Sequence, residues 1–194
     1  MHGYMNKLAR LFALLGGTVL SLLIIQTCLS VIGRSVNSIL HSDFMQTTLP
    51  GLSNTLLATG VGPINGDYEL TEAGMAFVIF AFIPLCQLNG GHASVDIFTS
   101  KLPSALNRAI RMVIEVIFAL VVTVIAWQLF QGMLSKLNSG QTTLLLQFPV
   151  WWGYAFCLTG ALVTAIIAIY VAAIRVVEFT AAKEILPLEM GADH

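Results

Sequence analysis

Charged residues are scarce in this sequence. Asp, Glu, Lys and Arg make up 10% of its 194 residues, against about 25% in soluble domains. Hydrophobic residues make up 57%. The net charge of −1 provides no basic surface of the kind that binds nucleic-acid phosphates. This composition excludes an ordinary soluble domain and a nucleic-acid-binding protein.

The sequence also has few of the residue patterns that support catalysis. Its three cysteines, Cys28, Cys86 and Cys157, lie in apolar stretches and form no C-x-x-C pair, so we interpret them as small buried side chains. Nucleophile motifs, phosphate-binding glycine loops and paired catalytic carboxylates are missing from the sequence. We therefore expect a non-enzymatic chain that binds no cofactor or metal of its own.

Long stretches without any charged residue are present instead, and together they cover about half of the sequence. They are Leu11–Gly33, Ala73–Gly91, Val116–Ser135 and Leu137–Ile174. A helix that crosses the roughly 30 Å hydrocarbon core needs about 20 mostly apolar residues. The last stretch is too long to be a single span, and it is interrupted at residues 138–141. Pro149 lies after this interruption and suits an early position of the fourth helix.

These stretches predict an all-α membrane protein that forms a single transmembrane domain over residues 1–194. The expected spans are residues 8–33, 71–87, 109–130 and 149–177. The first apolar run is longer than the core of a signal peptide and lacks an A-x-A-like cleavage site, so we expect it to be retained as a helix.

The distribution of basic residues predicts the orientation. Basic residues gather before the first span, between the second and third, and after the fourth: Lys7, Arg10, Lys101, Arg108, Arg111, Arg175 and Lys183. The other side has only Arg34 and Lys136. Because Lys and Arg concentrate in cytoplasmic segments, we expect both termini, the connection 89–108 and the tail 178–194 to be cytoplasmic. The connection 35–70 is then on the outer side.

The connections carry further predictions. Prolines, glycines and apolar residues in the connection 35–70 favour one or two short helices on the outer surface, with a packed loop of no binding role as the alternative. The residues of the connection 89–108 predict a short amphipathic helix within it. The apolar segment 142–148 is expected along the outer interface or against the bundle. Trp151 and Trp152 follow it, as aromatic residues do at headgroup depth.

Ionisable and amide side chains near the ends of the spans are the candidate functional residues, because burying an unpaired charge is costly. We expect Arg34 to pair with Glu69 or Glu72 and thereby to lock the first two spans together. Arg111 and Glu115 are four residues apart on one helix, which allows an ion pair. We expect such a pair near the interface or an anchor from Glu115 to another helix, and ion coupling through Glu115 is the alternative.

Other polar residues suggest contacts between helices. Gln26 and Gln87 can form hydrogen bonds between helices, and Pro84 is expected to kink the second span and free a carbonyl. His92 and Asp96 would share a helix face, but two ligands do not make a metal site. We interpret them as a hydrogen-bonded pair.

Several motifs resemble the small membrane subunit of TRAP transporters over roughly residues 8–180. An acidic start, Glu69–Glu72, precedes a span that ends at Pro84-Leu85. The segments Gly91–Phe98 and Leu102-Pro103 follow, and then Ser139–Thr143 and Phe148–Trp151 with Tyr154. The chain departs from the family pattern in lacking a basic residue shortly before Gly91-His92 and in having a long connection 35–70.

The resemblance implies an accessory subunit of the bacterial inner membrane. A periplasmic binding protein would capture an organic acid such as a C4-dicarboxylate or sialic acid. A large multi-span subunit would import it, usually with sodium bound to that subunit, and the small subunit would serve as a scaffold in contact with membrane lipids. The alternative is a self-sufficient homo-oligomeric transporter that works through Glu115.

Overall fold

The computed structural model describes residues 2–91 and 103–181, and within them the regular secondary structure is helical. The helices are α1 (His2–Leu40), α2 (Asp43–Thr48), α3 (Pro50–Ala58), α4 (Asp67–Leu88), α5 (Ser104–Ser139) and α6 (Trp151–Ala181). Four of them, α1, α4, α5 and α6, are long and apolar enough to cross a membrane. The predicted all-α membrane fold with four spanning helices is confirmed.

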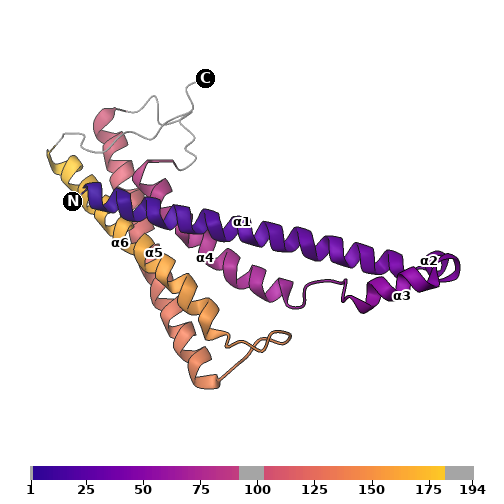
Figure 1. The fold of residues 1–194 in the computed structure, drawn as a ribbon. Helices are drawn as coiled ribbons and strands as arrows, with labels where there is room; N and C mark the ends of the chain where they lie inside the picture. Colours follow the sequence, from indigo (N-terminus) through magenta and orange to yellow (C-terminus); the bar gives the residue numbers. More distant parts are fainter. Residues whose placement is uncertain (1, 92–102, 182–194) are drawn as a thin grey trace.

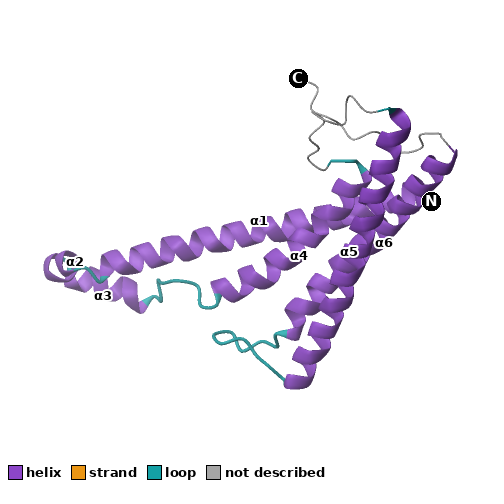
Figure 2. Ribbon diagram, turned by 180° about the vertical axis from the view of Figure 1, so that it is seen from behind, coloured by secondary structure: helices purple, strands orange, loops and turns teal. Residues whose placement is uncertain are grey.

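The four long helices form two pairs that meet at one end and separate toward the other (Figures 1 and 2). α1 lies along α4, α5 lies along α6, and α4 packs on α6 where the pairs meet. We call the end that holds the start of α1 and the last turns of α6 the converging end. The other end, with residues 59–66 and 140–150, is the diverging end. The side of the membrane that each end faces remains a prediction.

Small residues let the helices approach closely. The buried residues of α1 recur at every seventh position along most of the helix, at Ala9, Gly16, Leu23 and Ser30. A Cβ atom added at Gly16 would lie 2.8 Å from the Ala81 Cβ on α4, and one added at Gly160 of α6 would lie 2.9 Å from the Phe80 Cβ. Close backbone approach at small residues is a common basis of helix association in membranes.

Helix α6 is the centre of the bundle. In the most apolar 18-residue segment of α6, 56% of the residues are buried. In the corresponding segment of each of the other three spanning helices, the buried share is 17%. Ala9 of α1, Leu88 of α4 and Val171 of α6 form one core cluster at the converging end. The outer faces of α1 and α5 are therefore covered by lipid or by another protein.

Pro84 frees a backbone acceptor in α4, and α6 supplies the donor. A proline cannot donate to the carbonyl four residues earlier, which here is that of Phe80. The Thr164 Oγ1 hydroxyl donates to the Phe80 oxygen at 3.0 Å and also to the Gly160 oxygen at 2.8 Å. The prediction that Pro84 frees a carbonyl for bonding between helices is confirmed, with a donor that the sequence did not identify.

Some predicted boundaries differ from the helices observed. α1 continues to Leu40, seven residues beyond Gly33, because the polar residues that follow Arg34 are compatible with a helix outside lipid. Two short helices, α2 and α3, do occupy the following connection, and the buried Ser53 Oγ hydroxyl donates to the Leu40 carbonyl at 2.8 Å. Pro149 lies outside α6, which begins at Trp151.

Candidate functional site

Asp67 ties the first turn of α4 to α1 at the diverging end. Its Oδ2 atom accepts from the Ser30 hydroxyl at 2.5 Å and lies 3.1 Å from the Arg34 Nη2 atom. The Gln26 side chain donates to the Asp67 carbonyl at 3.4 Å. A lock between Arg34 and α4 therefore exists, but its acidic partner is Asp67. The expected pairing with Glu69 or Glu72 is wrong.

The sequence contained a signal for Asp67. Gly66 adopts a left-handed conformation with φ of 78° and precedes the helix, and acidic residues are favourable in a first helical turn. The span predicted from residue 71 leaves Asp67 in the connection, whereas α4 begins at Asp67. The first turn of α4 brings Asp67 beside Arg34 and directs Glu69 elsewhere.

Glu69 holds the hairpin-like segment 141–150, which we call the 141–150 loop. The Glu69 carboxylate accepts from the backbone N–H of Leu145 at 2.7 Å and from that of Leu146 at 2.9 Å. Within the loop, the Thr143 N–H donates to the Phe148 carbonyl at 2.9 Å. A side chain of α4 thus fixes the connection between α5 and α6, which links the two helix pairs where they separate.

The tip of the 141–150 loop presents apolar side chains. Leu144 is 85% exposed and Leu145 is 61% exposed, whereas Leu146 packs against Gly66. At the base of the loop, the Trp151 and Trp152 rings meet edge to face with centroids 6.2 Å apart. This combination of a fixed backbone and exposed leucines is suited to contact with a membrane surface or another protein.

Glu72 lies one turn along α4 from Glu69 but has different surroundings. It lines a cavity of about 470 Å³ between α4 and the α5–α6 pair, together with Tyr154 and Cys157. Among the described residues Glu72 takes part in no hydrogen bond or ion pair. It therefore provides a natural control for substitutions of Glu69.

Gln87 and Glu115 connect α4 to α5 near the converging end. The buried Gln87 side chain donates from Nε2 to the Glu115 carboxylate, which confirms the expectation that Gln87 bonds between helices. In the described part of the chain no ion pair joins Arg111 to Glu115. Of the two arrangements expected for Glu115, the anchor to another helix is the one observed. The Glu115 carboxylate faces the neighbouring helix, where the Gln87 amide satisfies it.

Arg175 and Glu178 form a buried ion pair that the sequence analysis did not identify. The Arg175 Nη1 atom lies 2.8 Å from the Glu178 Oε2 atom, and the two side chains are only 9% and 5% exposed. Arg175 is one helical turn beyond Val171, a member of the core cluster with Ala9. The sequence predicts Arg175 only as one of the basic residues on the cytoplasmic side of the fourth span. The three-residue spacing to Glu178 was the available signal.

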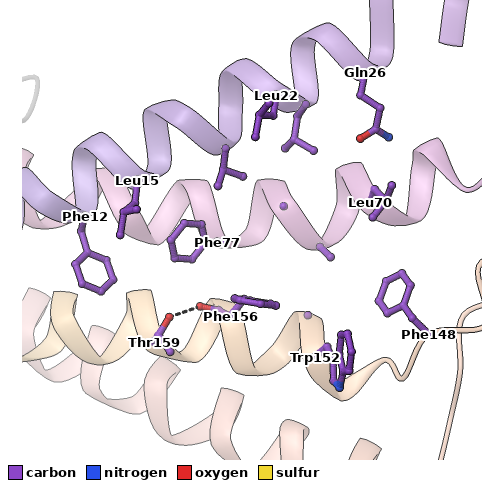
Figure 3. A pocket seen from close by; sticks show the side chains of 15 residues that line it. Phe12, Leu15, Leu22, Gln26, Leu70, Phe77, Phe148, Trp152, Phe156 and Thr159 are labelled. Carbon is purple, nitrogen blue, oxygen red and sulfur yellow. Dashed lines mark hydrogen bonds between the residues drawn. The ribbon is translucent and has the colours of Figure 1, made fainter. Parts of the chain in front are cut away.

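An apolar cavity of about 770 Å³ lies between the helix pairs, and we call it the interpair cavity. It is lined by α1 from Phe12 to Gln26, by α4 from Leu70 to Phe77, and by Phe148, Trp152 and Phe156 on the other side. Figure 3 shows Phe12 near one end of the cavity and Gln26, Leu70 and Phe148 near the other. The lining has apolar character except for Gln26 and Thr159.

The residues that the structure describes do not form a candidate metal centre. No group of three or more His, Cys, Asp or Glu side chains is placed to hold a metal ion there. His92 and Asp96, the pair predicted on one helix face, lie outside the described residues, as does the predicted helix around them.

Comparison with known proteins gives one family. Residues 23–179 match the family model described as "Tripartite ATP-independent periplasmic transporters, DctQ component". No curated protein and no solved structure matches the chain. The match covers α4 and α5 completely, α6 except for its last two residues, and residues 23–40 of α1. The matched family is a family of transporter components. The chain therefore belongs to the DctQ component family of TRAP transporters and is a small permease subunit of the inner membrane.

Proposed function

We propose that this chain is a scaffold subunit of a sodium-driven importer of organic acids such as C4-dicarboxylates or sialic acid. It packs on the large transport subunit, which holds the sodium and substrate sites, and this chain binds no cofactor of its own. The observation that carries the proposal is the position of the ionisable groups. Asp67, Glu69 and Glu72 lie at one end of the bundle and Glu115 and Arg175 near the other, and the stretches between them are uncharged.

The outer surfaces of the helices support a scaffold role. Large apolar residues of α5 are exposed on the face away from α6, including Ile114, Ile117, Leu120 and Val124. Among the residues of this helix whose burial is described, Ala119, Val122 and Ala126 alone are in the buried core. The fixed bonding between helices favours a rigid body, and the exposed faces are available to lipid and to the large subunit.

The first prediction concerns dependence on the partner. Co-expression with the large membrane subunit should yield a stable complex, and deletion of this chain should abolish uptake of the organic acid. Glu115→Gln should leave uptake nearly unchanged, because the amide can still bond to Gln87. Transport by the isolated chain in vesicles that is lost in Glu115→Gln would instead establish the self-sufficient transporter.

We further propose that the diverging end faces the periplasm and helps to dock the binding protein, through the connection 35–70 and residues 140–152. Both segments present exposed apolar residues, with Phe44 at 76% and Leu144 at 85% exposure. A few residues near the centre of an interface, each contributing about 2 kcal/mol or more, commonly supply most of its binding energy. A loop fixed by Glu69 and two short helices at the end of α1 provide such anchors without a large ordering cost.

The second prediction tests this docking. Phe44→Asp and Leu144→Asp should each lower uptake about tenfold at limiting binding protein, while the membrane complex remains intact on gel filtration. Tyr4→Asp is the matched control, because Tyr4 is 80% exposed and belongs to the converging end. Unchanged uptake in both variants, with the binding protein kept limiting, would refute docking at these residues.

A further inference from the structure

We propose that the interpair cavity is a binding site for an acyl chain of a membrane phospholipid, whose phosphate lies toward Arg34. This proposal does not depend on the transport role. The cavity is formed by three spanning helices and the 141–150 loop. It therefore lies where hydrocarbon is the solvent, and lipid tails are as apolar as leucine side chains.

The length and the lining of the cavity suit a lipid chain. From Phe12 to Gln26 the cavity follows α1 for about 21 Å, a length comparable with that of an extended acyl chain. The residues that line it are mostly apolar. An extended hydrocarbon chain can therefore lie along α1 in contact with apolar side chains.

One end of the cavity leads to polar groups, as an amphiphile requires. Gln26 lies at the diverging end of the lining (Figure 3), and Ser30 and Arg34 follow at four-residue intervals on the same face of α1. The Arg34 side chain is 52% exposed and uses Nη2 for Asp67. A guanidinium group has five N–H donors and suits phosphate, so Arg34 can bind a headgroup while it remains paired with Asp67.

The experiment uses the complex with the large membrane subunit in nanodiscs and a phosphatidylcholine that carries a photoreactive diazirine in one acyl chain. Cross-links should map to the α1 segment 12–26 and to Trp152 or Phe156. Leu22→Trp should reduce them about tenfold, because the ring occupies the cavity. Ile25→Trp is the matched control: Ile25 is 56% exposed, against 61% for Leu22, but does not line the cavity.

A second cavity variant and two further labelling experiments distinguish a phospholipid from a fatty acid and from the partner protein. Leu15→Trp, also in the lining, repeats the test if Leu22→Trp fails to assemble. A diazirine fatty acid without a phosphate should label the cavity less than the phospholipid does; equal labelling would overturn the role of Arg34. Labelling of the isolated chain that disappears in the complex would show that the partner protein fills the cavity, and equal labelling of Leu22→Trp and Ile25→Trp would overturn the site.

Discussion

Replacing Arg175 by methionine should destabilise the helix bundle by about 3–5 kcal/mol, the usual cost of removing one partner from a buried ion pair. The Arg175 guanidinium and the Glu178 carboxylate are 2.8 Å apart, and both side chains are at least nine-tenths buried. Methionine fills a similar volume but leaves the Glu178 charge in low-dielectric surroundings without its guanidinium. Reversible unfolding in mixed micelles, followed by circular dichroism, measures the loss.

A second variant separates the electrostatic effect from simple packing. Changing both Arg175 and Glu178 to methionine should recover most of the lost stability, because a buried pair replaced by apolar side chains of similar size is often neutral or better. Arg10→Met is the control, since Arg10 is exposed on α1 and should change stability by less than about 0.5 kcal/mol. A double variant as unstable as Arg175→Met would contradict this account.

Replacing Glu69 by alanine should release the 141–150 loop. The carboxylate accepts two backbone N–H groups, those of Leu145 and Leu146, at 2.7 and 2.9 Å. Hydrogen bonds to an ionised acceptor are stronger than those between neutral groups. Amide exchange at these two residues should therefore accelerate about 10- to 100-fold, which hydrogen–deuterium exchange can measure.

The control for this experiment is Glu72→Ala, which removes a nearby carboxylate of the same helix that has no such bonds. It should leave exchange at Leu145 and Leu146 unchanged. Glu69→Gln should fall between the wild type and Glu69→Ala, because a neutral amide oxygen is a weaker acceptor than a carboxylate. If Glu72→Ala loosened the loop as much as Glu69→Ala, general loss of negative charge would explain the effect better than the specific bonds.

The helices themselves were predictable from sequence. A bilayer requires long apolar segments with internally satisfied backbones, so four charge-free stretches predicted four spanning helices. Pro84 was informative for the same reason: a proline in a helix leaves a carbonyl that must find a donor. Gln87 was expected to bond between helices because an amide in an apolar span requires a partner.

The partners of the polar residues were decided by tertiary structure. Arg34 binds Asp67 because the first turn of α4 begins four residues earlier than predicted, and this places Asp67, with Ser30, against α1. Glu115 bonds to Gln87 because of the rotation of α5 about its axis. Sequence spacing reports which residues share a helix face, but it does not report which face meets which neighbour.

The sequence by itself determined the class of protein, the number of spanning helices and the family to which the chain is similar. The tertiary structure alone decided that α6 is central, that Arg175 is buried and that the helix pairs separate around the interpair cavity. The physical reason is that lipid-facing and protein-facing surfaces are equally apolar in a membrane. Hydropathy therefore locates the helices, and only their packing shows which sides are covered.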